Sequence, residues 1–258
     1  MRLAVVGKGG VGKSVVAGTA ARLLARRGHT VLALDSDLMP GLARSLGLGA
    51  GADVASPLEG AAERGEDGRW RLKKGVGPVR AVRRYAVAAP DGVRLLQSGK
   101  LPPEGTGAIM SSLQAYYKVV HRLPRARTFA DWAMVGALPA GPRQAASNWA
   151  PFAETFLILV EATWQSALTA RRVARVVRSR EGSGAVGLVA NKVMEPADVG
   201  RVEELVGEDV VAAIPADERV REAERAGVAL LDHDPSSPAV RAIERLVDDL
   251  PVGNGRAR

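Results

Sequence analysis

Short apolar runs alternate along the chain with longer segments in which apolar residues recur at the spacing of an α-helix. Each short run predicts a strand. Because the runs are apolar throughout, they are typical of a parallel sheet that is covered on both faces. The predicted strands are residues 2–6, 30–35, 92–98, 131–137, 155–161, 185–191 and 210–215. Helical periodicity is clearest over 15–28 and 164–180, and Ser237 is the expected N-cap of a last helix. The pattern predicts one doubly wound α/β domain, with a mostly parallel sheet and helices on both faces.

The pattern breaks down in two segments. Residues 48–84 are rich in glycine and charge and follow neither period, so we expect an irregular segment inserted in a domain that spans 1–250. Residues 251–258 are expected to form a flexible basic tail, which lacks the apolar face of a membrane anchor. No apolar run is long enough to span a bilayer, and the N-terminus has no signal-peptide pattern. The expectation is a cytoplasmic protein with no membrane partner.

The stretch GKGGVGKS, residues 7–14, follows the first predicted strand and fits two phosphate-binding patterns. As G-x-G-x-x-G it is the turn of a dinucleotide fold, with Asp35 near the position of a ribose-binding acid. As G-x-x-x-x-G-K-[ST] it is a mononucleotide P-loop, in which Lys13 contacts the β- and γ-phosphates and the Ser14 hydroxyl ligates Mg²⁺. A dinucleotide turn has no need of a lysine after its last glycine, so the P-loop is favoured, with ATP or ADP and Mg²⁺ as ligands. The expected phosphate-binding residues are Gly9, Gly10, Val11, Gly12, Lys13, Ser14 and Val15.

Lys8, inside the loop, extends the motif. GKGGVGKS resembles the deviant Walker A motif of the MinD/ParA-type ATPases. In that family a lysine at this position reaches the nucleotide site of the partner subunit in an ATP-bound dimer. The resemblance implies that Lys8, Lys13 and Asp37 are catalytic, that ATP drives formation of a homodimer, and that Lys8 stabilises charge that develops during phosphoryl transfer.

Three further segments resemble this family. LALDSDLMPGLARSLG, residues 32–47, is similar to its switch I, which assigns Asp37 to the attacking water and the Mg²⁺ shell, so the implied metal ligands are Ser14 and Asp37. Leu38 and Gly41 replace the proline and the asparagine that are usual there. ANKV and IPADERV resemble the segments beside the adenine base, and the implied base-side residues are Asn191, Lys192, Pro215 and Asp217.

The segment VEATWQSALTARRVARVV, residues 160–177, resembles most closely the accessory ATPases that mature nickel carbon-monoxide dehydrogenase. The likeness covers nearly the whole chain and is weakest over 48–95. Those ATPases bind metal through a C-x-C pair shared across the dimer. Ala108 and Met110 stand at the corresponding positions here, and the chain has no cysteine, so it cannot bind metal through thiolates.

The Walker B strand, FADWAMVGALPAGPR, allows two alignments. If residues 139–141 match the P-A-G of switch II, Ala137 occupies the position of the Walker B aspartate and the acid is missing. If Asp131 is that acid, its spacing to Gly136 is one residue too long and a longer loop follows. We favour the first alignment because it needs no gap downstream.

The net charge of +8 indicates either a compositional excess of arginine on a solvated surface or a surface that binds polyanions. We favour the first.

The leading hypothesis is a dimerising ATPase switch, with slow Mg²⁺-dependent hydrolysis, that acts on a client protein in metalloenzyme maturation or a related accessory role. One alternative is a nucleotide-gated scaffold with little hydrolysis. Another, not favoured, is a ParA-like ATPase that binds DNA through the arginines of one helix: Arg171, Arg172, Arg175 and Arg178.

Overall fold

The computed structural model describes residues 1–39, 41–49, 57–100, 107–179 and 184–250. Within these ranges the main sheet has eight strands in the order β10-β9-β8-β1-β7-β2-β6-β5. Neighbouring strands are parallel except for β5 and β6. The strands are β1 (Arg2–Gly7), β2 (Val31–Asp35), β5 (Val87–Ala88), β6 (Arg94–Gln97), β7 (Ala133–Ala137), β8 (Thr155–Val160), β9 (Ala185–Val193) and β10 (Val210–Pro215). The sheet confirms the predicted α/β fold.

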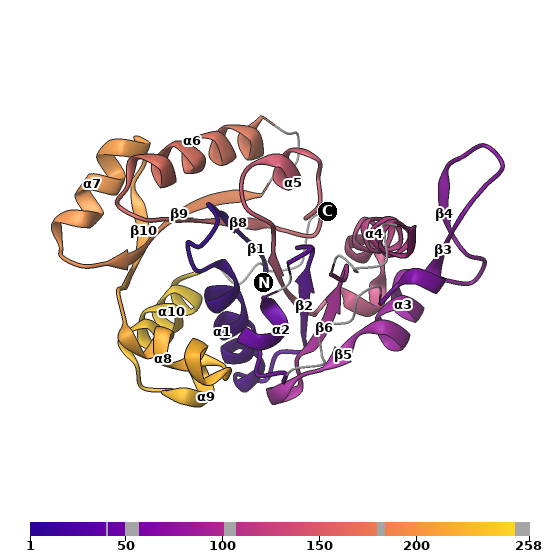
Figure 1. The fold of residues 1–258 in the computed structure, drawn as a ribbon, viewed down its shortest axis with the longest axis horizontal. Helices are drawn as coiled ribbons and strands as arrows, with labels where there is room; N and C mark the ends of the chain where they lie inside the picture. Colours follow the sequence, from indigo (N-terminus) through magenta and orange to yellow (C-terminus); the bar gives the residue numbers. More distant parts are fainter. Residues whose placement is uncertain (40, 50–56, 101–106, 180–183, 251–258) are drawn as a thin grey trace.

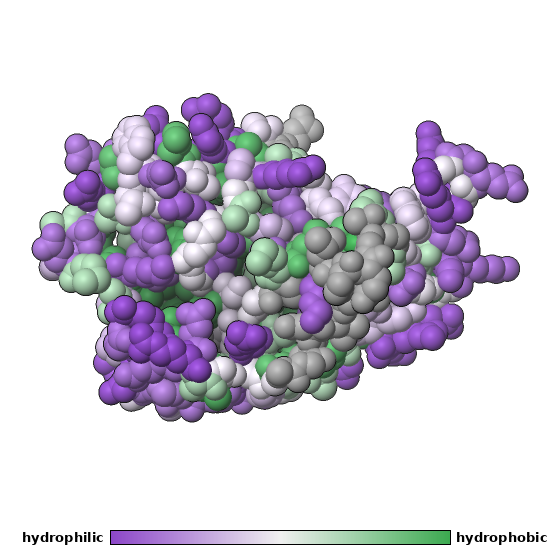
Figure 2. Space-filling model, viewed as in Figure 1, coloured by the Kyte–Doolittle hydropathy of each residue, from purple (hydrophilic) through white to green (hydrophobic). Residues whose placement is uncertain are grey.

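Helices cover both faces of this sheet (Figure 1). In Figure 2 most of the surface facing the viewer is hydrophilic, as expected for a sheet whose apolar faces are covered by helices. The described helices are α1 (Lys13–Arg26), α2 (Leu42–Ser45), α3 (Pro78–Tyr85), α4 (Gly107–Val120), α5 (Arg143–Ala146), α6 (Trp164–Arg178), α7 (Ala197–Val206), α8 (Glu218–Ala226), α9 (Leu230–His233) and α10 (Pro238–Asp249). Short 3₁₀ turns are η1 (Glu59–Ala61), η2 (Pro90–Gly92), η3 (Leu123–Arg125) and η4 (Arg127–Phe129).

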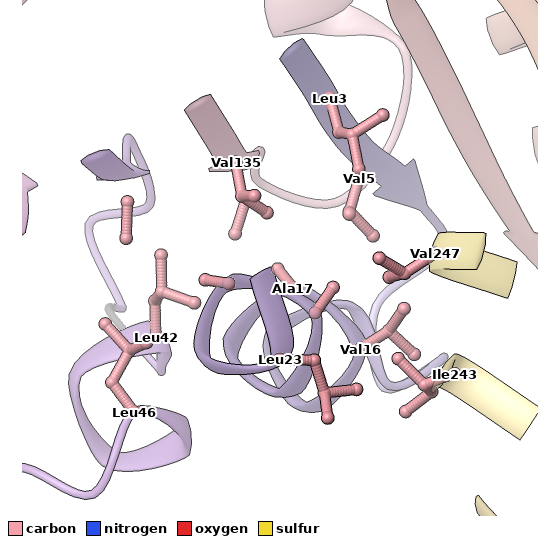
Figure 3. Packing of buried hydrophobic residues seen from close by; sticks show 14 of the residues in the cluster. Leu3, Val5, Val16, Ala17, Leu23, Leu42, Leu46, Val135, Ile243 and Val247 are labelled. Carbon is pink, nitrogen blue, oxygen red and sulfur yellow. The ribbon is translucent and has the colours of Figure 1, made fainter. Parts of the chain in front are cut away.

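Two hydrophobic cores lie on opposite faces of the sheet, because successive side chains of a strand point to opposite sides. In β1, Leu3 and Val5 pack with helices α1, α2 and α10, whereas Ala4 and Val6 pack with α3, α4, α6 and α7. Figure 3 shows the first core, in which Val16 of α1 and Ile243 of α10 lie beneath β1. The strand that leads into the glycine loop is therefore buried on both sides.

Helix α1 is held closely by its neighbours. Its residue Gly18 lies so near α2 that a Cβ there would be 2.7 Å from the Cβ of Ser45. The buried Arg22 side chain donates from Nε to Asp91 and from Nη1 to Asp232, both at 2.6 Å. Burial alone would lower the pKa of Arg22, but the hydrogen bonds to both carboxylates raise it overall. The helix that follows the glycine loop is thus fixed at the middle of its length.

The segment 48–84 was predicted to be irregular, and this prediction is wrong for the part of it that the structure describes. Strands β3 (Ala62–Arg64) and β4 (Trp70–Leu72) form an antiparallel hairpin, and α3 begins at Pro78. The hairpin strands are too short to show an alternating pattern, and α3 buries only Ala81 and Val82. Residues 50–56 and the tail 251–258 lie outside the described residues. No helix in the described ranges is long and apolar enough to cross a membrane.

Candidate functional site

The glycine loop connects β1 to α1 at the carboxyl edge of the sheet. Gly10 and Gly12 have φ of +77° and +95°, conformations that residues with a Cβ rarely adopt. A Cβ at Gly12 would also lie 2.6 Å from the side-chain nitrogen of Asn191. Glycine at these positions lets the chain turn tightly before the first turn of α1, where backbone N–H groups have no partners within the helix. The cradle fits a phosphate group for this reason.

Lys13, the first residue of α1, points back over this loop. Its Nζ donates a hydrogen bond to the carbonyl of Lys8 at 3.0 Å. Burial lowers the pKa of the Lys13 ammonium, and the nearby Asp37 carboxylate partly opposes that shift. The structure thus brings the Lys13 ammonium close to Asp37, which belongs to a separate motif in the sequence, and to the backbone of Lys8.

Two aspartates, one at the end of β2 and one in the loop that follows it, have different roles. Asp35 is buried, and its carboxylate accepts hydrogen bonds from the backbone N–H of Asp37 at 3.0 Å and of Leu42 at 3.1 Å. It therefore holds the loop between β2 and α2 in place, which is not the geometry of an exposed ribose-binding acid. Asp37 lies farther along this loop and accepts from the N–H of Met39.

Gly41, a departure from the family pattern, brings the same loop close to the start of α1. A Cβ at Gly41 would lie 2.8 Å from the Ser14 hydroxyl oxygen. An asparagine at this position would therefore require the Ser14 side chain to move. Ser14 and Asp37, the two expected Mg²⁺ ligands, come from α1 and from this loop.

Asn191 and Lys192, at the end of β9, support the glycine loop directly. Asn191 is buried and its Nδ2 donates to the Val11 carbonyl at 2.6 Å. The Lys192 Nζ donates to the Gly10 carbonyl at 2.7 Å and forms an ion pair with Glu161, also at 2.7 Å. Sequence reasoning did not single out Glu161, although it occupies the acidic position of the VEATWQS segment. The contact of Asn191 and Lys192 with the adenine base stays a prediction.

Pro215 ends β10, and the Asp217 carboxylate that follows it caps two helices. One oxygen accepts from the N–H of Arg219 in α8 and the other from the N–H of Ala239 in α10, both at 3.0 Å. The N–H of Ala216 donates to the carbonyl of Val193, which keeps this loop beside the end of β9. Asp217 therefore has a structural role, and its contact with the base stays a prediction.

The structure distinguishes between the two alignments of the Walker B segment. Ala137 is the last residue of β7 and is paired in register with Val5 and Asp35. Asp131 precedes β7, at the end of the sheet opposite the glycine loop. This geometry favours the first alignment, in which alanine occupies the carboxyl end of the strand. The N–H of Gly141 then donates to the Gly7 carbonyl, so residues 139–141 pass beside the glycine loop.

Gln144 was not identified from the sequence. Its side-chain oxygen accepts from the Ser36 hydroxyl at 2.5 Å, and its side-chain nitrogen donates to the Ser36 carbonyl at 3.1 Å. The two residues join the loop after β2 to helix α5, which follows the loop after β7. A lone glutamine gives no signal of this contact, because it depends on two segments about a hundred residues apart.

The stretch that corresponds to the C-x-C pair lies on α4. Ala108 is partly buried, Ile109 is buried and Met110 is exposed. Among the residues that the structure describes, no three or more His, Cys, Asp or Glu side chains are grouped as a metal site requires. The His121 ring contacts the Asn148 carbonyl at 2.9 Å, and the His233 ring contacts Glu222 at 3.2 Å.

A buried strand, a glycine turn and a helix that begins with a lysine and a serine define a P-loop nucleotide-binding protein. The family model described as the CobQ/CobB/MinD/ParA nucleotide binding domain matches residues 3–231. The chain belongs to this family, whose members bind nucleotides and include ATPases.

Similar proteins and structures agree with this membership. The carbon monoxide dehydrogenase accessory protein CooC of Rhodospirillum rubrum is 26% identical over 92% of this chain and 91% of its own length. An uncharacterised ATP-binding protein of Methanocaldococcus jannaschii is also 26% identical, over 95% of this chain and 96% of its own. A ParA family ATPase of Chlorobium tepidum has a TM-score of 0.71 at 18% identity, covering 97% of this chain and 98% of that one. MinD of Pyrococcus horikoshii, in complex with Mg-ADP, has a TM-score of 0.70 at 19% identity, covering 100% and 99%.

Proposed function

We propose that this protein is a switch that binds ATP or ADP with Mg²⁺, dimerises when ATP is bound, hydrolyses ATP slowly and acts on a client protein. The observation that carries the proposal is the position of Lys13, whose partly buried ammonium donates to the Lys8 carbonyl and lies close to Asp37. A cation held inside a glycine turn is suited to the β- and γ-phosphates of a nucleoside triphosphate. The likeness to the accessory protein CooC supports a role in metalloenzyme maturation or a related accessory role.

The residues of the site have distinct roles in this proposal. The backbone N–H groups of residues 9–15 hold the phosphates, and Lys13 balances their charge. The Ser14 hydroxyl and Asp37 hold Mg²⁺, which would offset negative charge on the phosphate oxygens. Asp37 also orients the attacking water. Lys8 places its ammonium in the nucleotide site of the second subunit.

Exposed apolar side chains support dimerisation at the carboxyl edge of the sheet. Met39 follows β2, Trp164 follows β8 and Met194 follows β9, and their exposed fractions are 86%, 61% and 81%. These three side chains follow strands that end at the edge carrying the glycine loop, and a dimer formed there would cover them. The proposed dimer covers this edge, which also carries Lys8.

Hydrolysis is proposed to be slow because Ala137 leaves the end of β7 without a carboxylate. Mg²⁺ then depends on Ser14, Asp37, phosphate oxygens and water. The same observation favours a second candidate function, a scaffold that changes its partners according to the nucleotide bound but scarcely hydrolyses it.

DNA binding through α6 is not favoured. The Arg178 guanidinium forms a bidentate ion pair with the carboxylate of Glu208, and this hydrogen bond raises the pKa of Arg178. One of the four arginines proposed for phosphate contacts is therefore already paired. The others, Arg171, Arg172 and Arg175, are exposed on this helix.

Calorimetry with ATP, ADP and NAD in the presence of Mg²⁺ tests the proposal. We expect ATP and ADP to bind, NAD not to bind, and sedimentation to report a dimer with ATP and a monomer with ADP. Tight NAD binding without ATP binding would overturn the P-loop assignment. A chain that binds ATP yet stays monomeric at every concentration would overturn the dimer.

A further inference from the structure

The positive charge of the chain is concentrated in one segment. Residues 68–90 contain seven basic residues, Arg69, Arg71, Lys73, Lys74, Arg80, Arg83 and Arg84, and no aspartate or glutamate. Since the whole chain has a net charge of +8, the other 235 residues together contribute only +1. The arginines themselves are distributed along the whole chain, but outside this segment aspartate and glutamate nearly balance them.

The segment lies far from the glycine loop. It comprises β4, α3 and the turn between them, beside the β6–β5 edge of the sheet, and the β3–β4 hairpin projects from the body of the protein (Figure 1). Figure 2 shows hydrophilic residues over this projection and below it. Its charge therefore does not serve the proposed nucleotide site.

Helix α3 is oriented so that its cations face solvent. Ala81 and Val82 are buried against α4, whereas Arg80, Arg83 and Arg84 are exposed. The same is true of Lys73 and Lys74 in the preceding turn. Among the described residues, no carboxylate lies within ion-pair distance of any of these five side chains. We refer to Lys73, Lys74, Arg80, Arg83 and Arg84 as the cationic surface.

Several contacts hold this surface in a defined shape. The N–H of Lys73 donates to the Ala61 carbonyl, which fixes the turn to the base of the hairpin. The Arg80 guanidinium lies over Gly75, whose φ is +80°, so close that a Cβ there would be 2.8 Å from Nη1. The Arg84 guanidinium lies 5.4 Å from the centre of the Tyr85 ring. Ordered arginines lose less conformational entropy when they bind a partner.

The cationic surface also contains a hollow and nearby apolar side chains. Val79, Arg80, Arg83 and Arg84 line a shallow hollow of about 360 Å³. Trp70 and Tyr85, on either side of it in the sequence, are only partly buried. Arginine and aromatic side chains together are enriched in the interfaces between proteins.

We propose that the cationic surface is a docking site for an acidic surface of a partner protein. This inference rests on the proposed function only in assuming that the partner is a protein. A nucleic acid fits less well, because the adjoining hairpin exposes Glu63 and Glu66, whose carboxylates would repel a phosphate backbone, whereas Asp67 is paired with Arg71. A protein surface can match this mixture of charges, with carboxylates opposite α3 and basic groups opposite the hairpin.

A fluorescein-labelled peptide with two Glu-Asp clusters around a leucine is a suitable probe. Fluorescence anisotropy at about 150 mM salt, where the Debye length is about 8 Å, measures its binding to the full chain. We expect R80E/R83E/R84E to weaken binding at least about tenfold. The matched control R171E/R172E/R175E reverses three exposed charges on α6 and should change binding by less than about twofold, since only unspecific attraction is removed. Thermal melting verifies that both variants fold.

Several outcomes would overturn the proposal: no binding of the peptide by the unmodified chain, or an equal loss in both variants. Tighter binding of duplex DNA of the same net charge, lost through the same three arginines, would mean that the surface binds nucleic acid. ATP binding is measured on the same samples. If the unmodified chain binds the peptide but not ATP, the proposed function fails and the docking surface stands.

Discussion

The side-chain nitrogen of Asn191 lies 2.6 Å from the carbonyl oxygen of Val11, which joins the end of β9 to the glycine loop across 180 residues of sequence. Gly12 packs against the same side chain. Asn191 therefore supports the glycine loop from β9, the strand that the family resemblance assigns to base recognition. This contact links the conformation of the phosphate cradle to the end of β9, where we propose that the base binds.

We expect Asn191→Ala to weaken the binding of both ATP and GTP, because it removes a support of the phosphate loop that both nucleotides share. A buried hydrogen bond of this kind contributes about 1 kcal/mol, so the expected loss is roughly five- to tenfold for each. Calorimetry with both nucleotides measures it. Unchanged GTP affinity, with only the preference for ATP reduced, would show that Asn191 reads the base and does not support the loop.

Lys13→Met is expected to abolish ATP binding and yet raise the stability of the protein without nucleotide. Burial disfavours the charged ammonium and lowers its pKa in the folded state. Because the pKa of Lys13 is lower in the folded state, the charged side chain decreases the free energy of unfolding at neutral pH. This destabilisation decreases as the pH rises from the pKa of Lys13 in the folded state towards its unfolded value near 10.5.

Denaturant unfolding of both proteins at a series of pH values checks this prediction. The stability advantage of Lys13→Met should narrow as the pH approaches 10, because the unfolded wild-type chain then binds more protons than the folded one. A variant that is less stable than wild type at pH 7 would contradict it.

For Lys8→Ala we expect nucleotide binding to persist and turnover to fall by at least about tenfold, since the proposed role of the side chain is to act on the site of the other subunit. The Lys8 carbonyl that accepts from Lys13 is unaffected by this change. Turnover per subunit should rise with concentration in the wild type. An equal loss of ATP affinity and turnover would place Lys8 in its own subunit's site.

Ala137→Asp is expected to increase Mg²⁺-dependent hydrolysis several-fold. Ala137 belongs to the core that α1 covers and ends β7 beside β1, so a carboxylate there would face the start of α1, where Ser14 lies. Phosphate release is measured at several Mg²⁺ concentrations, with Ala137→Asn as the uncharged control. If both variants have the same rate as wild type, the missing acid is not what limits hydrolysis.

The sequence by itself determined the parallel strands, the glycine loop and the role of Ser237 as a helix cap. Continuous apolar runs are a local signal of strands buried on both faces, and the Ser237 hydroxyl indeed accepts from the N–H of Val240. The motif also separated a mononucleotide site from a dinucleotide site, because Lys13 and Ser14 are adjacent to the last glycine.

Only the tertiary structure decided which residues meet. The contacts of Asn191 with Val11 and of Gln144 with Ser36 each join distant segments and have no local pattern. The alignment of Ala137 needed the register of β7 against β1 and β2. The basic residues of the cationic surface are visible in the sequence, but only the structure shows that α3 buries Ala81 and Val82 against α4 and leaves Arg80, Arg83 and Arg84 exposed. Periodicity reports burial along one element, whereas a site is made where elements from different parts of the chain converge.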